Sequence, residues 1–113
     1  MSDSKAWDQI ALRIQRVVAD SAELIDANTI ANANDVAATL REKTAAPEVS
    51  RGYWSTIRFC WDTRCEVEVF GDRIELYQFH DKRTDIQCFD HAPGVAFTTD
   101  ATRQLLAAIN AAG

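Results

Sequence analysis

The stretch EVEVFGDRIELYQF, residues 66–79, decides the fold, because apolar and charged residues alternate on both sides of a Gly71-Asp72 pair. This alternation predicts two antiparallel strands that share one apolar face. Glycine in the first loop position suits a type II′ turn, so we expect a two-residue loop. The resulting register places Glu68 directly opposite Glu75, although like charges in that position cost stability.

The flanking segments extend the sheet in both directions. Their apolar faces align with the first hairpin only if the preceding loop is Asp62-Thr63-Arg64 and the following loop is His80-Asp81-Lys82, because a slip of one residue would turn the apolar set to solvent. The predicted pairs are Val69 with Ile74, Val67 with Leu76, Phe59 with Val67, Ile57 with Val69, and Leu76 with Ile86. The buried face of this four-stranded antiparallel meander, over residues 53–90, consists of Ile57, Phe59, Trp61, Cys65, Val67, Val69, Ile74, Leu76, Ile86 and Cys88.

Helical periodicity appears on both sides of the sheet. Apolar residues at the spacing of one helical face predict a helix over residues 4–25 and a second over 29–43, which must stop before Pro47. The segment 44–52 is expected to be a connector, and a last helix is predicted over 99–112. The class is therefore α+β, with the helices packed on one face of an antiparallel sheet.

Composition limits the architecture and the partners. A chain of 113 residues with 47% hydrophobic content supports one domain, over residues 1–113. The net charge of -5 disfavours direct binding of nucleic acid, because that requires Lys and Arg to neutralise phosphates, and it favours a basic partner. There is no apolar run near the roughly 20 residues of a membrane helix, and the acidic N-terminus does not resemble a signal peptide. Three cysteines without a C-x-x-C pair indicate reduced thiols and a cytoplasmic protein.

The second face of the sheet is predicted to be open and charged. Two rows cross it, the first made of Arg58, Glu68, Glu75 and Gln87, the second of Glu66, Tyr77 and Asp85. Arg58 is expected to neutralise Glu68, which leaves surplus negative charge around an aromatic side chain. Such a face is an ordinary solvated surface or a docking surface where carboxylates steer a basic protein and tyrosine anchors it.

Catalytic chemistry has little support in the sequence. The segment FHDKRTDIQCFDHAPG, residues 79–94, holds His80, Cys88 and His91, but their spacing reproduces no known ligand set. Structural roles are expected for both histidines, and Gly-rich phosphate loops and nucleophile elbows do not occur. We expect a protein without catalytic residues, metal or cofactor; an enzyme acting through this segment is the alternative. The aromatic residues lack the cations that single-strand binding requires. Four of them fall on the outer face or at strand ends and are either covered by the connector or exposed as contacts: Trp54, Phe70, Phe79 and Phe89.

A small acidic α+β chain with the hairpin segment FGDRIELYQFHDKRTDIQCFDHAPG, residues 70–94, resembles the immunity proteins of bacterial toxin systems such as contact-dependent growth inhibition. The resemblance implies a protein that binds a cognate toxin domain, commonly a basic nuclease, and covers its active or substrate-binding surface. Acidic side chains then stand in for phosphates. We expect a monomer or weak dimer when free, with no direct contact to nucleic acid or membrane. The expected toxin contacts on the charged face are Glu66, Glu68, Glu75, Tyr77, Asp85 and Arg58, with Arg73 as a modulator.

Two other classes of binding protein share this character. A type III secretion chaperone is also small and acidic, and acts as a homodimer that wraps an unfolded effector segment. An inhibitor that mimics nucleic acid, such as an anti-CRISPR protein, uses acidic side chains in the same way as an immunity protein. Exposed apolar patches and a stable dimer favour the chaperone. A tight, salt-sensitive complex with one basic partner favours the immunity protein.

Overall fold

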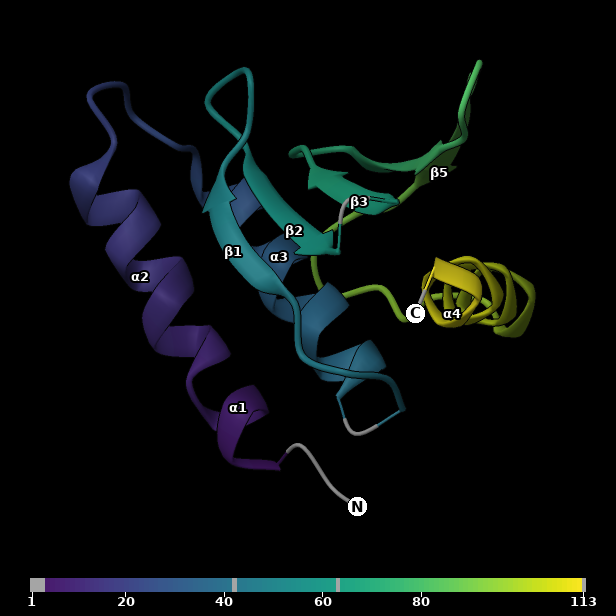
Figure 1. Ribbon diagram of the computed structural model, residues 1–113. Helices are drawn as coiled ribbons and strands as arrows, with labels where there is room; N and C mark the ends of the chain where they lie inside the picture. Colours follow the sequence, from purple (N-terminus) through teal and green to yellow (C-terminus); the bar gives the residue numbers. More distant parts are fainter. Residues whose placement is uncertain (1–3, 42, 63, 113) are drawn as a thin grey trace.

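The computed structural model describes residues 4–41, 43–62 and 64–112 and has the predicted α+β class (Figure 1). Three helical segments precede the sheet and one follows it. The elements, in chain order, are α1 (Ser4–Asp8), α2 (Ile10–Asp20), α3 (Ala27–Leu40), β1 (Glu48–Arg51), β2 (Ile57–Trp61), β3 (Cys65–Val69), β4 (Arg73–Phe79), β5 (Thr84–Asp90) and α4 (Thr99–Ala112).

The sheet has five antiparallel strands in the order β1-β2-β3-β4-β5, one more than predicted. The additional strand is β1, within the segment expected to be a connector. Val49 of this strand pairs with Phe59 of β2 and packs against the core, while α2 lies along the strand. Pro47 precedes the strand directly, a position where its missing N–H costs no ladder bond. The connector prediction was therefore wrong, because four residues suffice for an edge strand.

The register of the two central hairpins is confirmed. Val69 pairs with Ile74 and Val67 with Leu76 across the Gly71-Asp72 turn. Phe59 pairs with Val67 and Ile57 with Val69 in the preceding hairpin. Of the predicted loop between β2 and β3, Thr63 lies outside the described residues.

The predicted register of β5 is wrong by one residue. Leu76 pairs with Gln87, and Ile86 lies opposite Tyr77. The loop has four residues, not three, and the N–H of His80 donates to the carbonyl of Arg83 across 2.8 Å.

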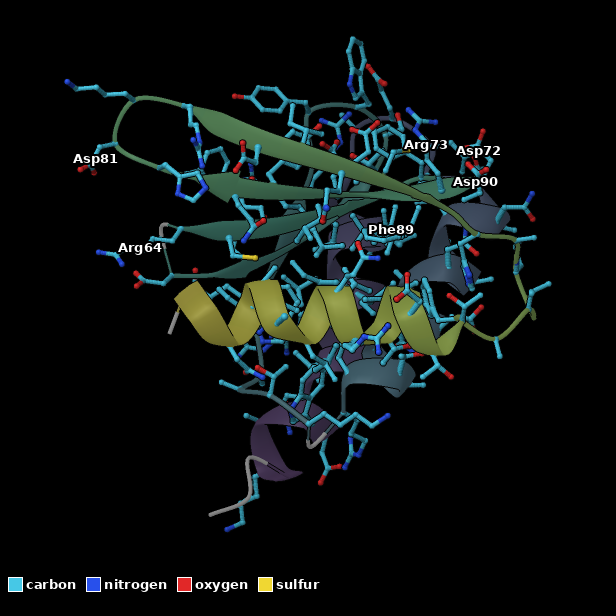
Figure 2. All side chains as sticks on the ribbon, turned by 90° about the vertical axis from the view of Figure 1, so that its right-hand side faces the viewer. Arg64, Asp72, Arg73, Asp81, Phe89 and Asp90 are labelled. Carbon is cyan, nitrogen blue, oxygen red and sulfur yellow. The ribbon has the colours of Figure 1, made fainter. Side chains whose placement is uncertain are left out.

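This shift exchanges the two sides of β5. Ile86 and Cys88 leave the predicted core and become exposed, and Phe89 packs against the core, between the strands and α4 in Figure 2. The reason is apolar area, because a phenyl ring directed inward buries more surface than an isoleucine at the open end of the sheet.

The helices differ from prediction mainly at their ends. The helix expected over 4–25 is interrupted at Gln9 and ends at Asp20. The helix expected over 29–43 begins at Ala27, because the Asp26 carboxylate accepts a hydrogen bond from the N–H of Thr29 at 2.8 Å. That helix ends at Leu40. The last helix begins at Thr99 as predicted.

The core lies between the inner face of the sheet and the helices. α3 contacts β2 and β3, and α4 contacts β3. No described helix has the length and apolar character needed to cross a membrane. The buried apolar residues are Trp7, Ile10, Ile14, Ile25, Ala33, Val36, Leu40, Ile57, Phe59, Trp61, Cys65, Val67, Val69, Ile74, Leu76, Leu105, Ala108 and Ile109.

Candidate functional site

The candidate site is the side of the sheet that faces away from the helices, here called the outer face (Figure 1). Strand pairing aligns its side chains in two rows. The first row is Ser50, Arg58, Glu68, Glu75 and Cys88, and the second is Glu48, Cys60, Glu66, Tyr77 and Ile86. Arg73 and Asp90 form a further pair at the end of β4 and β5. The predicted opposition of Glu68 and Glu75 is thus present.

Glu68 is buried, with 4% of its surface exposed. The loop of residues 52–56 folds over it, and the hydroxyl of Thr56 donates to its carboxylate at 2.6 Å. Gly52 is required in this loop, since a Cβ there would lie 2.6 Å from the same carboxylate oxygen. The Glu68 carboxylate is therefore a structural group covered by the chain itself.

Arg58 does not serve as the partner of Glu68 that the sequence predicted. Its Nη1 lies 3.7 Å from the carboxylate of Glu66, and its Nε donates to Ser50 Oγ at 3.4 Å. Glu66 lies diagonally across from Arg58 and is about a quarter exposed, so Arg58 can reach it. The Glu68 carboxylate already accepts a hydrogen bond from the Thr56 hydroxyl. The ion pair of Glu66 with Arg58 is long, and the partly exposed Glu66 carboxylate remains accessible to a partner.

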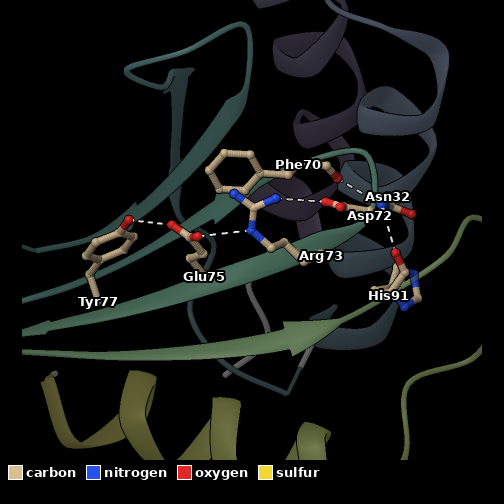
Figure 3. Close-up of polar contacts among 7 residues, drawn as sticks. All are labelled: Asn32, Phe70, Asp72, Arg73, Glu75, Tyr77 and His91. Atoms are coloured by element: carbon tan, nitrogen blue, oxygen red, sulfur yellow. Dashed lines mark hydrogen bonds and ion pairs between the residues drawn. The ribbon is translucent and has the colours of Figure 1, made fainter.

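Glu75 is compensated by its own strand (Figure 3). The Tyr77 hydroxyl donates to one of its oxygens at 2.5 Å, and Arg73 Nε donates to the other at 3.0 Å. Arg73 also donates to Asp72 at 2.9 Å and lies over the Phe70 ring, 3.8 Å from its centroid. The hydrogen bond with Glu75 raises the pKa of Arg73, and burial followed by Glu75 raises the pKa of Tyr77.

The charge of the outer face remains negative after these pairings. Apart from the buried Glu68, four carboxylates project from it against two guanidinium groups, so the described strands carry two accessible surplus negative charges on this side. The carboxylates belong to Glu48, Glu66, Glu75 and Asp90, and the guanidinium groups to Arg58 and Arg73.

Two residues predicted on this face lie elsewhere. The one-residue shift of β5 turns Asp85 and Gln87 to the inner side, where they pair with Gln78 and Leu76. Asp85 accepts from His80 Nε2 at 3.0 Å and lies 3.5 Å from Arg83 Nε, at the β4–β5 turn. Asp85 is therefore removed from the candidate contact set.

Exposed aromatic residues beside the outer face were not assigned from the sequence. Tyr53 is 85% exposed and Trp54 is 69% exposed, both in the loop that covers Glu68. Trp54, Phe70 and Arg73 line a surface pocket of about 470 Å³. The adjacent aromatic pair after Gly52 was the available signal, because a short loop between strands rarely has a core to bury two large rings.

His80, Cys88 and His91, on which the alternative of an enzyme depended, are not brought together. His80 lies in the β4–β5 turn, Cys88 is on the outer face, and His91 is buried against Asp35 at 3.1 Å with its ring stacked on Phe97. No three metal-binding side chains gather within the described ranges.

Two of the three thiols are poor nucleophiles. Burial raises the pKa of the Cys60 thiol to about 11, and burial likewise raises the pKa of Cys65 to about 11. A thiol attacks as the thiolate, so both are almost fully protonated near neutral pH. Neither Cys60 nor Cys65 is therefore a ready nucleophile, and the outer face offers mainly fixed charges and apolar rings.

The fold and site together define a small α+β protein with an anionic sheet face that the helices leave uncovered and that exposed aromatic rings flank. Comparison with family models, with curated proteins and with solved structures found no match to this chain.

Proposed function

We propose that this protein binds a basic toxin domain through the outer face and neutralises it by covering its active or substrate-binding surface. The observation that supports this proposal is the surplus of two accessible carboxylates on the outer face, next to the exposed rings of Tyr53 and Trp54. The proposal places the protein in the cytoplasm as an immunity protein without catalytic activity.

The carboxylates of this face are held before any partner arrives. Tyr77 and Arg73 fix both oxygens of Glu75, and Arg58 lies beside Glu66. Because ordered side chains lose little entropy on binding, such an array presents negative charge at low cost. A nuclease surface that contacts phosphates is cationic, so fixed carboxylates can occupy the positions of those phosphates.

Charge and aromatic area serve different parts of binding. The exposed Glu48 and the partly exposed Glu66 raise the rate of encounter, since steering acts through accessible charge. Tyr53 and Trp54 supply the apolar area that slows dissociation, because rings buried at an interface carry most of its energy. The contact set is completed by Arg58, Glu75 and Tyr77. Glu68 contributes indirectly, because its hydrogen bond to Thr56 holds the loop of residues 52–56 in place.

The proposal predicts that the gene immediately upstream encodes a toxin domain, and that domain is the partner to test. Cells that express this domain should survive only when this protein is co-expressed, and the purified pair should form a tight complex that weakens with salt. Continued cell death in the presence of folded protein would contradict the proposal.

Charge variants then test the face itself. Glu48→Lys and Glu66→Lys should each slow association about tenfold at low salt, with a smaller effect at high salt. Asp20→Lys is the matched control, because Asp20 is exposed at the end of α2 and the substitution changes the net charge equally. Trp54→Ala should instead accelerate dissociation. Equal association rates for Asp20→Lys and Glu48→Lys would exclude the outer face as the contact.

A further inference from the structure

The strand β5 is an open edge of the sheet. It is last in the strand order, and every one of its residues except Phe89 is exposed. The N–H of His91 donates to the carbonyl of Asp72 at 3.1 Å, and that of His80 to the carbonyl of Arg83 at 2.8 Å. These bonds show that the odd-numbered positions of β5 bond to β4.

Hydrogen bonds alternate along an antiparallel strand, so the even-numbered positions direct their N–H and C=O groups away from the sheet. A row of outward backbone groups is a template for another strand. The residues with outward groups are Thr84, Ile86, Cys88 and Asp90.

We propose that β5 pairs antiparallel with β5 of a second copy of this chain, around a two-fold axis at Gln87. In this register Ile86 lies opposite Cys88 of the second copy and Thr84 opposite Asp90. All four outward residues of each copy then form hydrogen-bonded pairs. A shift by two residues in either direction leaves Thr84 or Asp90 without a strand partner, so the register centred on Gln87 gives the longest ladder.

The side chains of the edge are self-complementary in this arrangement. Ile86 is 58% exposed in the single chain and would cover the small exposed Cys88 of the second copy. An exposed isoleucine on an edge strand lacks the charge that usually blocks edge pairing. Each copy buries its Ile86 once, so the contact closes as a symmetric dimer.

Charge at the two ends of β5 also favours the antiparallel direction (Figure 2). The β4–β5 turn carries Lys82 and Arg83 beside the acids Asp81 and Asp85, with His80 bonded to Asp85. The opposite end carries the exposed acids Asp72 and Asp90, and Arg73 there is already shared between Asp72 and Glu75. Antiparallel pairing brings Lys82 and Arg83 of one copy beside Asp90 of the other, whereas parallel pairing would place the two Asp90 side chains together.

The dimer would be one continuous ten-stranded sheet. Residues directly opposite each other in neighbouring strands project to the same side, so the outer faces of both copies point in one direction. The inference goes beyond the proposed function and needs nothing from it. Because an edge contact is smaller than a standard interface, we expect a dissociation constant of about 10 to 100 µM.

Sedimentation of the purified chain at increasing concentration tests the dimer. Ile86→Pro removes one outward N–H and leaves the β4 ladder intact, so it should raise the dissociation constant at least about tenfold. Ile86→Thr keeps that N–H and should still dimerise. A wild-type chain that stays monomeric well above 100 µM, or an Ile86→Pro variant that dimerises as well as wild type, overturns the proposal.

Disulfide trapping tests the register without a proline. In a Cys88→Ala background, Gln87→Cys places two cysteines on the two-fold axis, about 4.5 Å apart at Cα, which suits a disulfide. Asp85→Cys is equally on the edge, but its two copies would lie roughly 13 Å apart by strand rise, too far to bridge. Mild oxidation should cross-link the first variant and not the second. Equal cross-linking of both variants, or none in Gln87→Cys, contradicts the register.

Discussion

The hydroxyl of Thr56 lies 2.6 Å from a carboxylate oxygen of Glu68 and donates a hydrogen bond to it. This bond joins the loop of residues 52–56 to the middle of the sheet. It also explains how two glutamates can face each other across β3 and β4, since each glutamate has its own donor. Thr56 donates a hydrogen bond to Glu68, whereas Arg73 and Tyr77 donate to Glu75.

Thr56→Val should lower the free energy of unfolding by about 1 to 3 kcal/mol, because it leaves a buried carboxylate without its donor at nearly constant side-chain volume. Urea denaturation measures the change. Thr56→Ser keeps the hydroxyl and should lose less than Thr56→Val. A Thr56→Val chain as stable as wild type would show that water, not the loop, satisfies Glu68.

Asn32 is fully buried, and its Nδ2 donates to the carbonyls of Phe70 at 2.9 Å and of His91 at 3.3 Å (Figure 3). Asn32→Leu should lower the free energy of unfolding by about 1 to 3 kcal/mol, because two buried carbonyls lose their donor. The loss stays moderate since Asn32 Oδ1 has no hydrogen-bond donor within the described ranges. Asn34→Ala, at an exposed position two residues later, serves as control. Urea denaturation should show that its free energy of unfolding changes by less than about 0.5 kcal/mol.

Tyr77 should ionise at unusually high pH. Burial raises its pKa, and the adjacent Glu75 carboxylate raises it further. In a Tyr53→Phe chain, phenolate absorbance reports Tyr77 alone, because the sequence has two tyrosines. Adding Glu75→Gln should lower the pH at which that absorbance rises. An unchanged titration curve would show that the carboxylate does not act on the phenol.

Cys65 should make the fold sensitive to alkali. Its folded pKa of about 11 exceeds the ordinary 9.0, so the unfolded chain loses the thiol proton first as pH rises. Stability is therefore unaffected below pH 9 and falls between about pH 9 and 11, by roughly 2 kcal/mol for this group. The urea midpoint should change less between pH 9 and pH 11 in Cys65→Ala than it does in wild type. An identical pH dependence in the two chains would contradict the assignment.

The centre of the sheet could be predicted from the sequence because each residue there has one acceptable side. Val67 and Val69 on β3, and Ile74 and Leu76 on β4, alternate with charged residues, so a slip of one residue would expose all four. The opposition of Glu68 and Glu75 followed from the same register.

The edges could not be predicted in this way. On β5, Ile86 and Cys88 compete with Phe89 for the inner side, and both registers bury some apolar surface. The strand β1 has four residues, and Val49 is its only large apolar side chain. This stretch is too short for an alternating pattern to be recognised. The candidate site was predicted in part: Glu66, Glu75, Tyr77 and Arg58 share the outer face, and Asp85 does not.

Alternation along the chain is sufficient to assign the faces of β2, β3 and β4, because side-chain direction in a strand repeats every two residues and is a local property. The choice of partner for each charge is not local. Glu68 is satisfied by a loop that returns from β1, and Arg58 therefore turns to Glu66. The inward position of Phe89 likewise depends on the core that the packed helices complete, since burial energy depends on area removed from water and exists only once the surfaces meet.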